Sequence, residues 1–175
     1  MDISAAAVKE LREKTGAGVM ECKRALQDAE GNVEKATELL RQKGLTKHLK
    51  VAGRSVSQGL IESYIHTGGR IGALVELNCE TDFVARTDEF RTLAREIAMQ
   101  VASMDPRSVG SLDDSSDVDD DSALLNQEYI RDARKTIRDL VKETIGKVGE
   151  NIQVGRFMRF EVGARPEGKE AEGQE

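Results

Sequence analysis

An alternating apolar pattern over residues 59–79 places the strongest constraint on the fold. "GLIESYIH" is rich in strand-forming residues, "TGGR" follows it, and every second residue of "IGALVELNC" is apolar or a cysteine. A period of two is typical of strands, and a Gly-Gly pair between two such runs is typical of a hairpin turn. Both faces of the second strand are largely apolar near its centre, so we expect this strand to lie inside a sheet.

Helical patterns precede this hairpin. Residues 2–43 predict three short helices, with Ser4 and Asn32 as N-caps, since short polar side chains accept hydrogen bonds from the first free backbone amides. "TGAG" at residues 15–18 is expected to end the first helix and Gly44 to end the third, because glycine adopts the backbone angles of a helix exit.

Two more helices and a strand follow the hairpin. Thr87 is expected to cap a helix that ends before Pro106, and residues 123–148 predict a long helix with Ile130 and Ala133 in its buried stripe. "NIQVGRFMRFEVG" predicts a last strand with a bulge at Gly155. The fold class is therefore α+β: an N-terminal three-helix bundle, then an antiparallel three-stranded sheet with two long helices packed on it.

Composition suggests where the chain divides. We expect a three-helix module at 1–45, a linker rich in Lys, Gly and Ser at 46–58, an α+β core at 59–163 with an acidic loop at 105–122, and a charged, disordered tail at 164–175. The acidic loop has seven Asp and one Arg, a charge of 1 − 7 = −6, which equals the net charge of −6 of the whole chain. The loop lacks the spaced ligands and closing Glu of a calcium loop, so no metal site is expected.

No catalytic constellation is evident. His48 in the linker and His66 beside the hairpin turn are expected on the surface, no phosphate-binding loop occurs, and Cys22 and Cys79 are expected to be buried thiols. We expect a binding protein with no cofactor and no enzymatic chemistry. No apolar run is long enough to span a bilayer and the first residues do not form a secretory signal pattern, so a cytoplasmic location is expected.

Two places could present apolar residues to a partner. If the second helix buries Cys22 and its periodic neighbours, Met20 and Lys23 point outward and Val19 lies at the boundary. Such residues are either incidental surface or a partner contact. Phe83 follows Asp82 in a connection between strand and helix. Either Phe83 folds back into the core with Asp82 as a cap, or it is displayed to another molecule.

These residues carry a family resemblance. "VKELREKTGAGVMECKRAL" and "VELNCETDFVAR" resemble the two signature regions of the elongation factor Ts family, and "GENIQVGRFMRFEVG" resembles its closing strand. The resemblance covers most of residues 2–163. It implies a guanine-nucleotide exchange factor for elongation factor Tu, a translational GTPase, with an N-terminal module of the ubiquitin-associated type.

The resemblance also implies site residues. In the module these are Lys9, Val19, Met20 and Lys23, which would contact the nucleotide-binding domain. In the core they are Thr81, Asp82, Phe83 and Val84, with the Asp-Phe pair entering between helices of the GTPase near its phosphate and magnesium site. Tyr64 and His66 match a segment that touches another domain of the partner. The single hairpin-and-helix unit resembles the short form of the family, in which two chains pair, so a homodimer is expected.

Three other functions compete with this interpretation. A nucleic-acid binder could use the basic region from Lys43 to Arg54, but residues 1–55 carry only 11 basic against 8 acidic side chains, and stacking aromatics are scarce. A ubiquitin-like adaptor would leave the core motifs without a role, and an enzyme would lack a site. We therefore expect neither a nucleic-acid nor a membrane partner.

Overall fold

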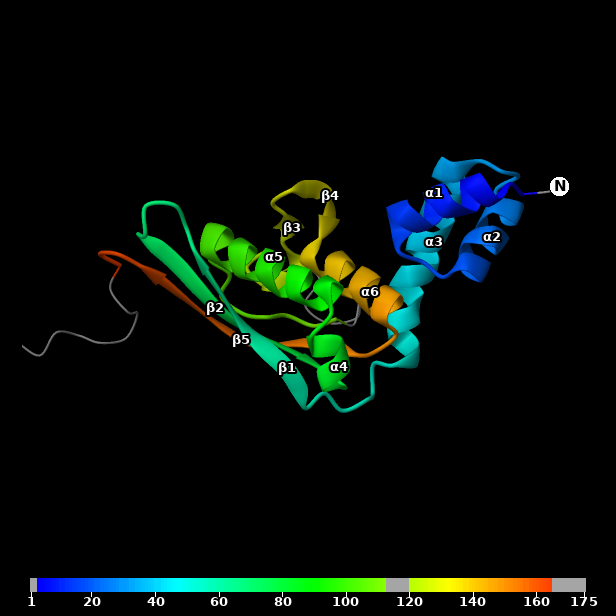
Figure 1. The fold of residues 1–175 in the computed structure, drawn as a ribbon. Coiled ribbons are helices and arrows are strands. Elements are labelled where there is room, and N and C mark those ends of the chain that lie inside the picture. Colours follow the sequence, from blue (N-terminus) through cyan, green and yellow to red (C-terminus); the bar gives the residue numbers. More distant parts are fainter. Residues whose placement is uncertain (1–2, 113–119, 165–175) are drawn as a thin grey trace, which may run out of the picture.

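A computed structural model describes residues 3–112 and 120–164, without the side chains of 45–47 (Figure 1). The helices are α1 (Ala5–Thr15), α2 (Val19–Asp28), α3 (Val33–Lys47), α4 (Asp82–Ala85), α5 (Asp88–Met104) and α6 (Ile137–Val148), with short 3-10 turns η1 (His48–Lys50) and η2 (Leu124–Asn126). The strands are β1 (Gln58–Ile65), β2 (Ile71–Cys79), β3 (Glu128–Tyr129), β4 (Asp132–Thr136) and β5 (Ile152–Glu161). The middle of the predicted acidic loop, 113–119, and the predicted disordered tail from 165 lie outside the described residues.

The first three helices pack around a small core of their own. Its buried members are Leu11, Cys22, Ala25, Leu26, Ala29 and Ala36. The predicted caps are confirmed: Ser4 accepts a hydrogen bond from the Ala7 amide, and Asn32 accepts one from the Lys35 amide. Gly16 ends α1 with a left-handed φ of 67°, as "TGAG" predicted. Local sequence therefore sets both ends of α1 and the start of α3.

The predicted end of the third helix at Gly44 is wrong, because α3 continues to Lys47 and packs against α6. A Cβ atom built on Gly146 of α6 would lie 2.9 Å from the Gly44 Cα atom and 3.1 Å from its carbonyl oxygen. The two glycines thus let the helix backbones touch where α3 meets α6. His48, expected on the surface of a linker, is buried immediately after α3. Packing against α6 therefore stabilises α3 beyond Gly44, a residue that would otherwise end the helix.

Two alanine substitutions at this crossing should have opposite effects. Gly146→Ala is expected to lower the free energy of unfolding by about 1–3 kcal/mol, because the new methyl group meets backbone that cannot move aside easily. Gly44→Ala should raise it by about 0.5–1 kcal/mol, because a Cβ there has no neighbour within 4 Å and alanine favours a helix over glycine. Urea unfolding followed by circular dichroism measures both. Equal effects would show that the helices do not touch at these glycines.

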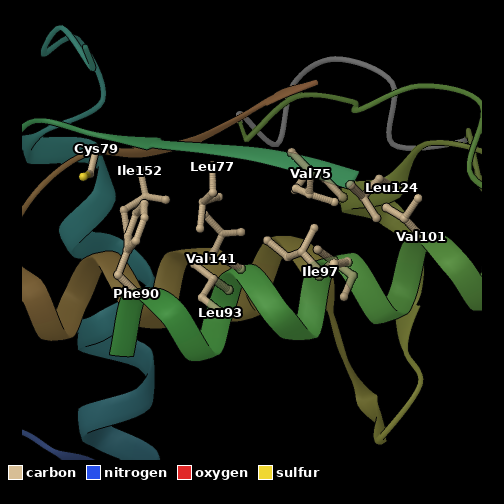
Figure 2. Close-up of a cluster of buried hydrophobic side chains, with 14 of the residues drawn as sticks. Val75, Leu77, Cys79, Phe90, Leu93, Ile97, Val101, Leu124, Val141 and Ile152 are labelled. Carbon is tan, nitrogen blue, oxygen red and sulfur yellow. The ribbon is translucent and has the colours of Figure 1, made fainter. Parts of the chain in front are cut away.

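The core sheet, within the described residues, has the antiparallel order β1-β2-β5, so β2 is interior as predicted. Its inward side chains point at α5 and α6, which lie together on one face of the sheet (Figures 1 and 2). Figure 2 shows Val75 and Leu77 of β2 facing Phe90, Leu93 and Ile97 of α5. The register slips between Glu76 and Leu77, which confirms the bulge at Gly155.

The predicted helix over 123–148 is wrong in its first half. Residues 128–136 form the β3–β4 hairpin, and α6 begins only at Ile137. Buried Gln100 of α5 explains the difference: its side chain donates to the Glu128 carbonyl (3.0 Å) and accepts from the Ile130 amide (3.0 Å). These bonds satisfy backbone groups that a helix would have paired internally. Ile130 and Ala133, expected in a buried stripe, are exposed.

Candidate functional site

One turn of helix, α4, displays an aromatic ring at the end of β2. Thr81 is its N-cap and accepts a hydrogen bond from the Val84 amide at 3.3 Å. Val84 and Ala85 are buried in the core, with Val84 only 4% exposed, whereas Phe83 is 77% exposed. Successive helical residues point about 100° apart, so burying 84 and 85 turns 83 outward. The alternative that Phe83 folds back into its own core is therefore wrong.

Charge around this turn favours the observed conformation. Asp82 lies in the first turn, where a negative charge interacts favourably with the helix dipole, and its carboxylate pairs with Arg86 at 2.8 Å. The buried Cys79 thiol donates to the Thr81 carbonyl at 3.1 Å. Burial raises the pKa of this thiol, and the nearby Glu150 carboxylate raises the pKa further. Cys79 therefore stays a protonated donor beneath the turn, as expected for a buried thiol.

The module presents a second candidate surface. Met20 is 62% exposed and Val19 is half exposed at the start of α2, and Lys23 is exposed one turn later. The predicted outward phase of Met20 and Lys23 is thus confirmed. Lys9, on α1, is exposed, and its Nζ atom lies 3.9 Å from Oε1 of Glu13. Exposed basic side chains beside exposed apolar ones suit a partner surface with apolar pockets and negative charge.

The third candidate pair lies at the hairpin turn. Tyr64 is half buried on the helix-facing side of β1, and its hydroxyl lies 3.1 Å from Nδ1 of exposed His66. Their ring centroids are 6.1 Å apart. The sheet extends away from α4, which contacts the other end of the hairpin, so the structure does not bring this pair to Phe83 (Figure 1).

Sequence reasoning did not identify the outer face of the sheet as a candidate surface. α5 and α6 cover one face, and no described helix covers the other (Figure 1). The outer face has exposed apolar side chains on all three strands, namely Ile61, Ile65, Leu74, Met158 and Phe160, beside the Glu76–Arg156 ion pair. Contiguous apolar surface of this kind marks interaction sites. The signal was present in "RFMRFEV", where both alternating sets contain large apolar residues.

A cleft of about 570 Å³ between the module and α6 is lined by several basic side chains. Arg41 donates a bidentate hydrogen bond to Glu38, and this bond lowers the pKa of the Glu38 carboxyl to about 2. Lys43 pairs with Asp28, and Lys135 pairs with Glu143. Carboxylates therefore pair with three of the basic side chains that line the cleft, which also include Lys14, Lys50, Arg54 and Lys147.

Metal and membrane features are absent from the part of the chain that the structure describes. Residues 3–112 and 120–164 contain no group of three His, Cys, Asp or Glu side chains that could hold a metal ion. No helix in those ranges combines the length and the hydrophobicity needed to cross a bilayer.

Comparison with known proteins shows the family to which this chain belongs. The family model described as "Elongation factor TS" matches residues 3–121 and 80–167. The chain is 47% identical to elongation factor Ts of Thermoanaerobacter sp. (strain X514), over 92% of this chain and 95% of that protein. It is 46% identical to elongation factor Ts of Fervidobacterium nodosum, over 93% and 100%, and 44% identical to that of Trichodesmium erythraeum, over 97% and 93%. An exposed aromatic on a short helix, a three-helix module and an α+β core thus occur together in a chain that belongs to the elongation factor Ts family.

Proposed function

We propose that this chain is a cytoplasmic translation elongation factor that binds elongation factor Tu·GDP and promotes the release of GDP, so that GTP can replace it. It acts as a guanine-nucleotide exchange factor with no covalent chemistry of its own and needs no cofactor. Family membership supports the role in elongation. The observation that carries the mechanism is Phe83, whose apolar ring is exposed while the residues that follow it are buried.

The proposed mechanism is a wedge. Asp82 and Phe83 enter between helices of the GTPase near its phosphate and magnesium site, while Thr81 and Val84 hold the turn in place. Mg²⁺ requires near-ideal octahedral geometry, so a small displacement of the elements that hold it weakens the ion and the nucleotide phosphates together. A tenfold loss of nucleotide affinity requires about 1.4 kcal/mol, and burying one Phe side chain supplies about 1.5–3 kcal/mol. Burial of one Phe ring therefore supplies enough free energy for a tenfold loss of nucleotide affinity.

Release of the factor follows from the same coupling. If the bound factor weakens nucleotide binding, nucleotide binding weakens the factor by the same free energy. Rebinding of GTP thus expels Phe83 from its site on the GTPase. The chain is regenerated unchanged, which is what a catalyst of exchange requires.

The remaining surfaces have separate proposed roles. The module, residues 1–45, docks on the nucleotide-binding domain of the GTPase through Lys9, Val19, Met20 and Lys23, and residues 46–58 link it to the core. The core, residues 59–163, carries the wedge, and Tyr64 and His66 touch another domain of the partner. The apolar outer face of the sheet pairs with the same face of a second chain. No nucleic acid or membrane takes part.

A nucleotide-release assay tests the proposal. Elongation factor Tu is loaded with fluorescent GDP and mixed with excess unlabelled GDP, with and without this chain. We expect release to be faster by about a hundredfold or more, since coupling of about 3 kcal/mol corresponds to a factor of that size. A matched experiment with a P-loop GTPase from outside translation should show no acceleration. If the chain leaves the release rate from elongation factor Tu unchanged, the proposed function is wrong.

A further inference from the structure

The helix that displays Phe83 is too short to hold its own orientation. α4 spans Asp82–Ala85, a single turn, and isolated helices of this length do not persist in water. Burial of Val84 fixes one side of the turn. The direction of the Phe83 ring also depends on the backbone of Thr81, the N-cap, where β2 has ended and the turn begins.

A carboxylate from a distant segment holds Thr81. Glu150, in the connection between α6 and β5, accepts a hydrogen bond from the Thr81 amide at 3.0 Å and another from the Thr81 hydroxyl at 2.7 Å. Because that hydroxyl donates its only proton to Glu150, its lone pairs face the Val84 amide, which donates to it. Hydrogen bonds to an ionised carboxylate are about twice as strong as neutral ones. Glu150 thus fixes both the backbone and the side chain of the N-cap.

A second carboxylate makes the reciprocal contact. Glu80 accepts a hydrogen bond from the Asn151 amide at 2.7 Å, so the neighbours 80–81 and 150–151 each present a carboxylate to the other's backbone. We refer to Glu80, Thr81, Glu150 and Asn151 as the carboxylate clamp. The buried Asn151 side chain donates to the carbonyls of Ala52 and Arg54, which follow the module. The hydrogen bonds of the clamp therefore connect three segments of the chain, residues 52–54, 80–81 and 150–151, at the N-terminus of α4.

We propose that Glu150 is a positioning residue for exchange, which fixes the angle at which α4 presents Phe83 to the GTPase. This inference rests on the proposed function. Glu150 need not touch the partner; it acts through Thr81. Without its carboxylate, the Thr81 hydroxyl can rotate and the turn can adopt several orientations, of which only some fit the site on the GTPase. Misplacing a positioned group by about 1 Å can cost up to a hundredfold in rate.

The experiment compares three single variants of the full chain. Glu150→Ala removes both acceptors, and Glu150→Gln keeps the shape of the side chain but only one acceptor oxygen. Glu96→Ala is the matched control, because the Glu96 carboxylate also accepts from a hydroxyl, that of Tyr129 at 2.7 Å, and pairs with Arg131 at 3.1 Å, but on α5. GDP release from elongation factor Tu is measured over a range of chain concentrations, and hydrogen exchange of the Val84 amide is measured by NMR in the free chain.

We expect Glu150→Ala to lower the maximal release rate about tenfold and to leave the half-saturating concentration within about twofold, since the module surface is untouched. Glu150→Gln should fall between Glu150→Ala and the unmodified chain. Exchange of the Val84 amide should be about tenfold faster in Glu150→Ala, because the turn opens more often. Glu96→Ala should change none of these quantities by more than about twofold.

A double variant separates positioning from general loss of structure. In a chain that already carries Phe83→Ala, Glu150→Ala should have little further effect on the release rate, because Glu150 acts through that ring. A full tenfold loss in this background, or an equal loss in Glu96→Ala, would overturn the inference. If the unmodified chain does not accelerate release, the proposed function is wrong, but the hydrogen-exchange measurement still tests the role of Glu150. Unchanged exchange of the Val84 amide in Glu150→Ala would show that Glu150 does not order α4.

Discussion

Phe83→Ala is expected to lower the maximal rate of GDP release from elongation factor Tu by about 10- to 150-fold, while the chain itself stays folded. The ring is 77% exposed, so its removal sacrifices little packing within the chain. In the proposed complex the same ring is buried, and losing about 1.5–3 kcal/mol of burial corresponds to that range of rates. Stopped-flow release of fluorescent GDP at saturating chain measures the effect, and thermal unfolding should shift by less than about 2 °C.

Two further variants make this result specific. Ile130→Ala truncates another exposed apolar side chain, in the β3–β4 hairpin, and should leave release unchanged. Met20→Ala, on the module, should raise the half-saturating concentration more than it lowers the maximal rate, because it removes a docking contact and leaves the wedge intact. A Phe83→Ala chain with full activity would show that the ring is not the wedge, even if the unmodified chain is an exchange factor.

Leu74→Asp is expected to convert a dimer into a monomer. Leu74 lies on β2, the central strand, and pairs with Met158 of β5 on the apolar outer face of the sheet. If two such faces pack together, each substitution places an unpaired carboxylate in the interface, which costs several kcal/mol. The dissociation constant of the dimer should rise about a thousandfold or more, since about 4 kcal/mol corresponds to that factor.

Light scattering after size-exclusion chromatography measures the outcome against the 19.2 kDa mass of one chain. The unmodified chain should have twice that mass, and Leu74→Asp the mass of one chain. Met104→Asp is the matched control, since Met104 is exposed to a similar degree but lies at the end of α5, away from the outer face. A dimer that survives Leu74→Asp with unchanged affinity would place the interface elsewhere.

Much of the local structure was predictable from residue patterns. The alternation in residues 59–79 predicted the hairpin, and the apolar residues on both faces of its second strand predicted the interior position of that strand. The caps at Ser4, Asn32 and Thr87 were correct, since a cap depends on a side chain and a backbone amide three residues away. The outward phase of Met20 followed from the geometry of a single helix.

Other features depended on contacts between distant segments. Gly44 would end a helix locally, but α3 continues because its glycine backbone packs on Gly146. Residues 128–136 have a helical pattern, yet Gln100 of α5 stabilises them as a hairpin by bonding their backbone. A capping box at Thr136 and Asp139 was a local signal that the helix starts later, and it was missed.

The candidate site likewise combines features that follow from local sequence with features that depend on packing between distant segments. By itself the sequence determined the helices, caps and strands that depend on neighbours a few residues apart, together with the identity of the motif that contains Phe83. Only the tertiary structure decided that this ring faces outward, that Glu150 reaches Thr81 across 69 positions of the chain, and that one face of the sheet has no helix over it. The physical reason is that exposure and long-range hydrogen bonds are properties of packed surfaces, and residue patterns record only the period of burial along each element.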